Sequence, residues 1–215
     1  MCRLWSLQVL RMEAKIVYFE VAGEENTVET LRLARERALQ RGISYVVLAS
    51  TRGYTAERAL EVFKETNIHL IAVTHQYGSL EGELFDDTVK QAFERAGHTL
   101  YIATHLFSTH RFWESTQVPG TMTNALYRFS QGMKVCIEIV LMAANGGLIP
   151  VGEDVVAVGG TDIGADTAVV IRAATSRNFD ALQVREVICK PLYSPPATMD
   201  VINKRVQELR ARRKK

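Results

Sequence analysis

The sequence predicts a three-layer α/β/α domain built around a mostly parallel β-sheet. Short apolar segments alternate along the 215 residues with longer amphipathic segments, and this alternation is typical of α/β folds. A composition of 47% hydrophobic and 23% charged residues is ordinary for a globular domain. The last three strand-like segments follow one another closely, which favours some antiparallel pairing near the C-terminus.

The first half of the chain supplies the clearest alternation. Asn26 and Glu29 form a capping-box pattern that should begin a helix, and Gly42 should end this helix after Arg41. Its inner stripe is expected at Leu31, Ala34, Ala38 and Leu39. Strands are predicted at residues 15–19, 45–49, 68–74 and 99–104, and further helices at residues 54–65 and 87–96.

The second half begins with a long, less regular stretch at residues 105–132, in which only a short helix at 121–129 is expected. A segment of this kind is often a functional lid or an oligomer contact. Residues 133–144 are apolar almost all round and predict a buried helix. Strands are then expected at residues 155–158, 168–172 and 184–189.

The two ends of the chain are expected to lie outside the α/β domain, which is assigned to residues 12–191. Residues 1–11 are interpreted as an extension ahead of a natural start at Met12, because their apolar run is too short for a signal peptide. Residues 192–215 predict a basic tail helix. We expect this helix to pack on its own domain or on a partner subunit, rather than to bind nucleic acid or a membrane. Its apolar stripe is Val201, Ile202, Val206 and Leu209.

Cysteine usage and hydropathy favour a cytoplasmic protein. Cys2, Cys136 and Cys189 are odd in number and lack the spacing of metal ligands. Reduced thiols are therefore expected, rather than disulfides or a metal site. No uninterrupted apolar run reaches the length of a membrane span.

Residues 45–60 are the most informative segment, because a predicted buried strand runs through a Ser/Thr/Gly turn into a predicted helix. The unpaired N–H groups and partial positive charge at a helix N-terminus favour phosphate or carboxylate. The turn adds hydroxyls, a fixed charge and a glycine that lets the backbone approach a ligand. The alternative is a well-capped turn without a ligand. The predicted ligands are Ser50, Thr51, Arg52, Gly53, Tyr54 and Thr55.

Polar residues also follow other predicted strands. The carboxyl ends of parallel strands meet at one edge of a sheet, so these residues are expected to frame the rest of a ligand. They are Thr74 and His75 after one strand, His105 after the next, and Gly159, Gly160 and Thr161 after a later one.

Candidates for proton transfer are His75, His105 and Asp166, since the ordinary pKa of histidine suits proton transfer near neutral pH. A Ser50–His105–Asp166 triad can be drawn, but no Gly-x-Ser-x-Gly nucleophile elbow supports it. Glu138 lies in the otherwise apolar helix and needs a buried partner, such as a backbone N–H group or an arginine. We expect its role to be structural.

Two pairs of segments resemble the C-terminal α/β domain of pyruvate kinase: residues 45–56 with 68–74, and residues 152–160 with 166–171. In that domain the Ser/Thr/Gly turn binds a phosphate of a sugar-bisphosphate effector, and the later glycine-containing loop closes over it. The chain resembles still more closely a family of stand-alone prokaryotic proteins that are similar to this domain. Residues 12–19, 25–31 and 164–171 carry that resemblance.

The resemblance implies binding of a phosphorylated small molecule, with flavin mononucleotide (FMN) as the candidate because it has been associated with this fold. Pyruvate kinase catalysis is not expected, since the chain is too short to hold the (β/α)₈ barrel as well. The alternatives are a flavin-dependent oxidoreductase or a phosphometabolite hydrolase with the same pocket, or a subunit whose pocket is vestigial. A homo-oligomer is also implied, with contacts at the tail stripe or at residues 107–113, which include Trp113.

Overall fold

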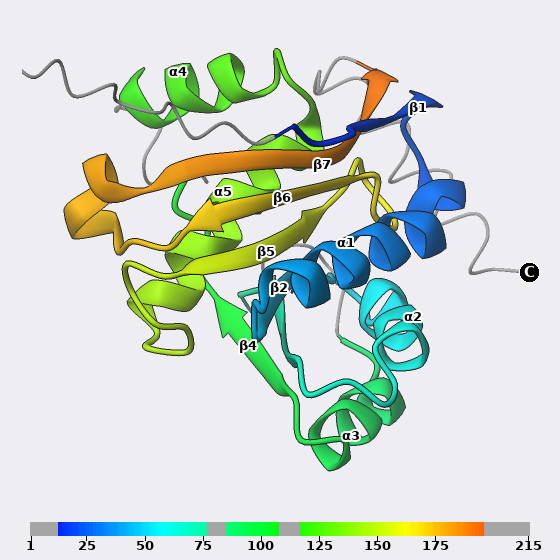
Figure 1. Cartoon of the computed structure of the whole chain (residues 1–215). Coiled ribbons are helices and arrows are strands. Elements are labelled where there is room, and N and C mark those ends of the chain that lie inside the picture. Colours follow the sequence, from blue (N-terminus) through cyan, green and yellow to red (C-terminus); the bar gives the residue numbers. More distant parts are fainter. Residues whose placement is uncertain (1–12, 77–84, 108–116, 196–215) are drawn as a thin grey trace, which may run out of the picture.

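A seven-stranded sheet forms the centre of the described part of the chain, which in this computed structural model is residues 13–76, 85–107 and 117–195 (Figure 1). The strand order is β1-β7-β6-β5-β2-β3-β4. Only β6 runs against its neighbours, and the other paired strands are parallel, so the predicted mostly parallel sheet with antiparallel pairing near the C-terminus is confirmed. The strands are β1 (Val17–Val21), β2 (Tyr45–Ala49), β3 (His69–His75), β4 (Thr99–Ala103), β5 (Asp154–Gly159), β6 (Thr167–Arg172) and β7 (Gln183–Tyr193).

Helices cover both faces of the sheet, which gives the predicted three layers. The helices α1, α2 and α3 contribute to one apolar cluster, and α5 contributes to the cluster on the opposite face, where α4 packs beside it. Figure 1 shows α1 and α2 on the near side of the sheet and α5 behind it. The helices are α1 (Thr27–Arg41), α2 (Tyr54–Val62), α3 (Asp87–Arg95), α4 (Gln117–Leu126) and α5 (Gln131–Asn145).

The central strand β2 explains why these two layers are needed. Val46 and Leu48 belong to the cluster under α1 and α2, whereas Val47 between them belongs to the cluster under α5. A strand whose successive residues are all apolar is typical of a parallel sheet that is buried on both faces. β2 has β5 on one side and β3 on the other, so it lies inside the sheet.

The start of α1 differs from the predicted capping box. Asn26 precedes the helix, but its side chain donates a hydrogen bond to the carbonyl of Val21 instead of capping α1, and Glu29 pairs with Arg32. A short 3-10 helix at Glu24–Asn26 leads into α1 and turns Asn26 towards the end of β1. Leu39 is 51% exposed, so its placement on the inner stripe was wrong.

The remaining elements match their predictions in kind and differ mainly at their ends. The helix α2 ends at Val62 instead of residue 65, α4 begins at Gln117 instead of residue 121, and β7 continues to Tyr193. Gly42 adopts the left-handed conformation that ends α1 as expected. The predicted extension at residues 1–11 and the apolar stripe of the tail lie outside the described residues.

Two further features concern hydropathy and thiols. No helix in the described ranges is long and apolar enough to cross a membrane. Cys136 and Cys189 are both buried and form no disulfide. Burial raises the pKa of the Cys136 thiol well above its ordinary value and that of Cys189 to about 12, which keeps both sulfur atoms in the unreactive thiol form.

Candidate functional site

The turn from β2 into α2 has a conformation that its sequence dictates. Gly53 precedes the helix with φ of 109°, a backbone conformation that side-chain-bearing residues rarely adopt. The Ser50 hydroxyl accepts a hydrogen bond from Ala56 N–H at 3.2 Å, and the first helical bond runs from Glu57 N–H to Gly53 C=O. The N–H groups of Gly53, Tyr54 and Thr55 therefore precede the intrahelical hydrogen bonds.

The end of β3 holds this turn in place. Ser50 N–H donates to Val73 C=O at 3.0 Å, and the Thr74 hydroxyl donates to Thr51 C=O at 2.9 Å. Parallel pairing of β2 with β3 puts Ala49 opposite Val73, so the residues that follow both strands meet at one edge of the sheet. This proximity was expected from the sequence because Thr74 and His75 follow Val73 directly.

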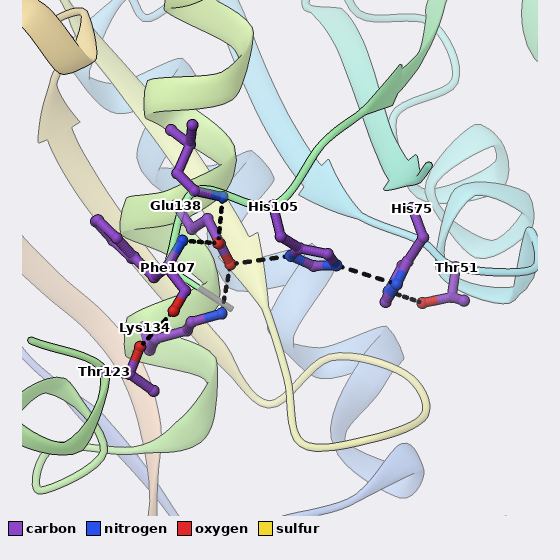
Figure 2. Close-up of polar contacts among 8 residues, drawn as sticks. Thr51, His75, His105, Phe107, Thr123, Lys134 and Glu138 are labelled. Atoms are coloured by element: carbon purple, nitrogen blue, oxygen red, sulfur yellow. Dashed lines mark hydrogen bonds and ion pairs between the residues drawn. The ribbon is translucent and has the colours of Figure 1, made fainter. Parts of the chain in front are cut away.

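A chain of hydrogen bonds leads from this turn into the protein interior. Thr51 Oγ1 lies 3.1 Å from His75 Nε2, and His75 Nδ1 lies 3.0 Å from His105 Nε2. His105 Nδ1 lies 3.3 Å from Glu138 Oε2, with which it also forms an ion pair when it is protonated. Figure 2 shows the four side chains in a row from the turn to α5. We call these four residues the Thr51–Glu138 chain.

The carboxylate at the buried end of the Thr51–Glu138 chain is fully engaged. Glu138 Oε1 accepts from the backbone N–H groups of Leu106 and Phe107 at 2.9 and 2.7 Å, and Oε2 is paired with Lys134 one helical turn away. The side chains of Lys134 and Glu138 are only 4% and 2% exposed. Burial by itself raises the pKa of Glu138, but the hydrogen bond from His105 and the charge of Lys134 outweigh it and hold this pKa well below its ordinary value.

An ionised Glu138 decides the direction of the hydrogen bonds when both histidines are uncharged. A carboxylate only accepts, so His105 Nδ1 carries the proton and His105 Nε2 becomes an acceptor. His75 Nδ1 then donates to His105, which leaves the lone pair of His75 Nε2 facing the Thr51 hydroxyl. This tautomer assignment follows from the hydrogen-bond network. It places an imidazole base against a hydroxyl group, with a second imidazole and a carboxylate behind it.

The predicted glycine residues after β5 have clear packing roles. A Cβ atom on Gly159 would lie 2.8 Å from Gly132 C=O, so the missing side chain lets α5 approach the strand end. A Cβ atom on Gly160 would lie 2.5 Å from Gly164 C=O inside the same loop. Thr161 is buried beside them and donates its backbone N–H to Asp166.

Asp166 lies apart from the histidines, and the drawn Ser50–His105–Asp166 triad does not form. The Asp166 carboxylate accepts from Thr161 N–H and the Thr167 hydroxyl, the Ser50 hydroxyl accepts from Ala56, and His105 contacts Glu138. Burial raises the pKa of Asp166. The carboxylate that accompanies His75 and His105 is Glu138, whose position in an apolar helix was the sequence signal for a buried partner. The expected backbone N–H partners of Glu138 are present, and a lysine and a histidine take the place of the expected arginine.

The site lies where the strand order reverses. From β2 the chain adds β3 and β4 on one side, whereas β5 pairs with β2 on the other side. Ligands in open α/β sheets bind at such a reversal, outside the carboxyl ends of the strands. The turn after β2 and the loop after β5 flank this point. No group of three or more His, Cys, Asp or Glu residues within the described ranges has an arrangement that could hold a metal ion.

A family model for the pyruvate kinase alpha/beta domain matches residues 29–171, which is more than half of the chain. The chain belongs to this family. The match spans the whole Thr51–Glu138 chain and the loop after β5. The resemblance inferred from the Ser/Thr/Gly turn and the late glycine loop is therefore confirmed at the level of the family.

Solved pyruvate kinases are also similar to this member of the pyruvate kinase alpha/beta domain family. A Cryptosporidium parvum pyruvate kinase in complex with ADP is 19% identical with a TM-score of 0.38, and the match covers 68% of this chain and 23% of that enzyme. A second structure of a pyruvate kinase from Cryptosporidium parvum is 20% identical with a TM-score of 0.36, and the match covers 69% and 23%. The chain thus spans less than a quarter of these enzymes, and similarity at this level adds nothing to the family assignment.

Proposed function

We propose that the protein binds a phosphorylated small molecule at the turn between β2 and α2, with FMN as the candidate ligand. The observation that carries this proposal is the left-handed Gly53 immediately before α2. The N–H groups of Gly53, Tyr54 and Thr55 at this start of α2 precede the first intrahelical hydrogen bond, and such groups attract anions. The family resemblance points to the same turn as a phosphate site. Kinase catalysis is not part of the proposal, because the matching family is the α/β domain alone.

In this proposal the phosphate is held by backbone and side chains of the turn. The N–H groups of Gly53, Tyr54 and Thr55 donate to its oxygens, the backbone N–H of Thr51 and the hydroxyl group of Thr55 add donors, and Arg52 supplies charge. Ser50 has a supporting role, because its hydroxyl already caps Ala56 N–H. The rest of the ligand is framed by the strand ends, namely Thr74, His75, His105, Gly159, Gly160 and Thr161.

An absorbance spectrum of the freshly purified protein tests the proposal. We expect a flavin spectrum, or an increased melting temperature when FMN or inorganic phosphate is added, because a ligand that binds only the folded state stabilises it. The variant Gly53→Trp should lose both effects. Gly97→Trp is the matched control, since Gly97 also has positive φ, follows α3 and has open space around its Cβ position. A colourless protein that neither compound stabilises would contradict the proposal.

The alternative is an enzyme with the same site, either a flavin-dependent oxidoreductase or a hydrolase of phosphorylated metabolites. The observation that favours an enzyme is the Thr51–Glu138 chain, because a base in contact with a hydroxyl group and oriented by further groups is typical of catalytic sites. Assays of flavin reduction by nicotinamide cofactors and of phosphoester hydrolysis separate the two reactions. If the double variant His75→Ala, His105→Ala keeps full activity, these histidines have no part in it.

The compartment and the assembly are proposals as well. We place the protein in the cytoplasm, since Cys136 and Cys189 are unpaired thiols and a reducing compartment preserves such thiols. We propose a second copy of the chain as its macromolecular partner, and no nucleic acid or membrane.

The third alternative is a subunit with a vestigial pocket. A ligand site filled by the protein's own side chains would favour this alternative, and such a protein would bind neither FMN nor phosphate.

A further inference from the structure

We propose that the Thr51–Glu138 chain is a catalytic proton relay that makes Thr51 the nucleophile in the hydrolysis of a phosphate monoester. The inference rests on the proposed phosphate site. It adds the reaction, the nucleophile Thr51, and the buried carboxylate of Glu138 that supports the base His75. It replaces Asp166, the carboxylate that the sequence offered, with Glu138.

The hydroxyl group of Thr51 is the group that His75 can deprotonate. His75 Nε2 lies 3.1 Å from Thr51 Oγ1, which is the reach expected of a base and its nucleophile. A base that activated water would instead need this nitrogen to face solvent or ligand. Thr51 also lies in the turn that begins α2, two residues before Gly53. Its oxygen is therefore close in sequence to the N–H groups that would hold the phosphate.

His105 and Glu138 are positioning residues for His75. His105 Nε2 accepts from His75 Nδ1–H at 3.0 Å, which fixes the tautomer that presents the Nε2 lone pair to Thr51. Glu138 fixes His105 in the same way and brings a negative charge to the buried end. Lys134 pairs with the same carboxylate, so the positive charge of a protonated imidazole pair lies near a second positive charge, the ammonium group of Lys134. A phosphate dianion at the turn offsets this positive charge.

The reaction proceeds in two displacements that balance. In the first, Thr51 Oγ1 attacks phosphorus and passes its proton to His75 Nε2, the bond from phosphorus to the ester oxygen breaks, and the released alcohol takes a proton from solvent. In the second, water attacks from the side that the alcohol has left and gives a proton to solvent. The bond from phosphorus to Thr51 Oγ1 then breaks, and this oxygen recovers the proton from His75. The products are an alcohol and inorganic phosphate.

Hydrolysis of 4-nitrophenyl phosphate and of FMN by the full-length protein tests the relay. We expect Thr51→Val to abolish hydrolysis, because valine has no hydroxyl group to attack phosphorus. His75→Gln should lower the rate by about 10²–10⁴-fold, the range of general-base contributions. Thr99→Val is the matched control, because Thr99 Oγ1 forms a similar bond to His69 Nε2 at 2.9 Å but lies at the start of β4. Its rate should equal that of the wild type. Acid quenching should trap one phosphoryl group on Thr51, which intact-mass and peptide spectra detect.

The pH dependence of the rate separates a relay from a merely structural role. Glu138→Gln removes the negative charge behind the imidazole pair, so the pair should lose its proton more easily and the acidic limb of the rate profile should move to lower pH. Melting curves of Glu138→Gln and His75→Gln show whether each variant folds. A rate that survives Thr51→Val overturns the relay, as does an unshifted profile in a folded Glu138→Gln protein.

The two proposals fail in different ways. If FMN or inorganic phosphate stabilises the protein but neither ester is hydrolysed and no phosphothreonine is trapped, the relay is overturned and the phosphate site stands. If neither compound binds and neither ester is hydrolysed, the phosphate site fails and the relay fails with it. Hydrolysis that falls equally in Thr51→Val and Thr99→Val also overturns the relay, because the loss would then be one of stability.

Discussion

Glu138 and Lys134 show at the scale of single residues how a polar pair can be accommodated inside an apolar helix. Both side chains are almost fully buried, and they lie one helical turn apart. Two charges in a protein interior lose their hydration, which is costly unless hydrogen bonds satisfy the remaining atoms. Here the backbone N–H groups of Leu106 and Phe107 satisfy the second carboxylate oxygen. The pair thereby ties the segment after β4 to α5.

Replacement of one member of this pair should cost more than replacement of both. Glu138→Gln leaves Lys134 charged and buried, so we expect a loss of about 3–5 kcal/mol in the free energy of unfolding. The double variant Lys134→Met, Glu138→Gln should recover part of this loss. Urea denaturation of the four proteins in a double-mutant cycle measures the coupling. A double variant that is no more stable than Glu138→Gln alone would contradict the expectation.

The same carboxylate should make stability depend on acid. The pKa of Glu138 is lowered in the folded state, so its contribution is present above the ordinary value of 4.5 and is lost as the pH falls from there towards the lowered value. The difference in stability between the wild type and Glu138→Gln should therefore be largest near neutral pH and should shrink below about pH 4.5. Urea denaturation of both proteins at pH 7 and at pH 3 tests this. A constant difference would show that the Glu138 charge is not responsible.

At the scale of elements, α5 depends on small residues where it meets the sheet. A Cβ atom on Gly132, in the first turn of α5, would lie 2.3 Å from Thr167 Oγ1 and 2.9 Å from Asp166 Oδ1. Ser130 caps this helix through Met133 N–H and also contacts the Thr167 hydroxyl. The N-terminus of α5 is thus packed directly on β6 and on the Asp166 loop.

We expect Gly132→Ala to destabilise the protein by about 1–3 kcal/mol, since the added methyl group must displace a packed hydroxyl and a carboxylate. Gly120→Ala is the control, because Gly120 lies in α4 and has nothing within 4 Å of its Cβ position. In that helix alanine should be neutral or stabilising by up to about 1 kcal/mol. Thermal melts of both variants decide the matter, and equal melting temperatures would argue against close packing at Gly132.

The sequence was most informative where local patterns decide the structure. Successive apolar residues such as Val46, Val47 and Leu48 predict a buried strand without tertiary information, and the strand ends then predict that Thr51 and His75 lie close together. The contact of His105 with Glu138 joins positions 33 residues apart through α5, and no local pattern specifies it. The reversal of β6 and the pairing of β1 with β7 likewise depend on how distant elements pack.

At the scale of the whole molecule, the sheet has β1 at one edge. Among the strands that the structure describes, β1 pairs with β7 alone, and apolar side chains are exposed there. An exposed edge strand offers unpaired N–H and C=O groups to another chain. The exposed residues are Tyr18 and Val21 of β1, and Leu192 and Tyr193 at the end of β7. The β1 edge is therefore a third candidate for the contact between copies, besides the tail stripe and residues 107–113. Phe107 itself is 7% exposed and packs in the core of its own chain.

We expect the wild type to form a homo-oligomer with a mass above the 24.1 kDa of one chain. Closed symmetry brings identical patches together, so a charge introduced at the contact acts twice and should dissociate the oligomer. Light scattering on Val21→Glu, Leu209→Glu and Trp113→Glu locates the contact among the β1 edge, the tail stripe and residues 107–113. Val28→Glu is the control, since Val28 is equally exposed but lies on α1. If the wild type has the mass of one chain, the expectation is wrong. Dissociation by Val28→Glu as well would mean that added charge acts without regard to position.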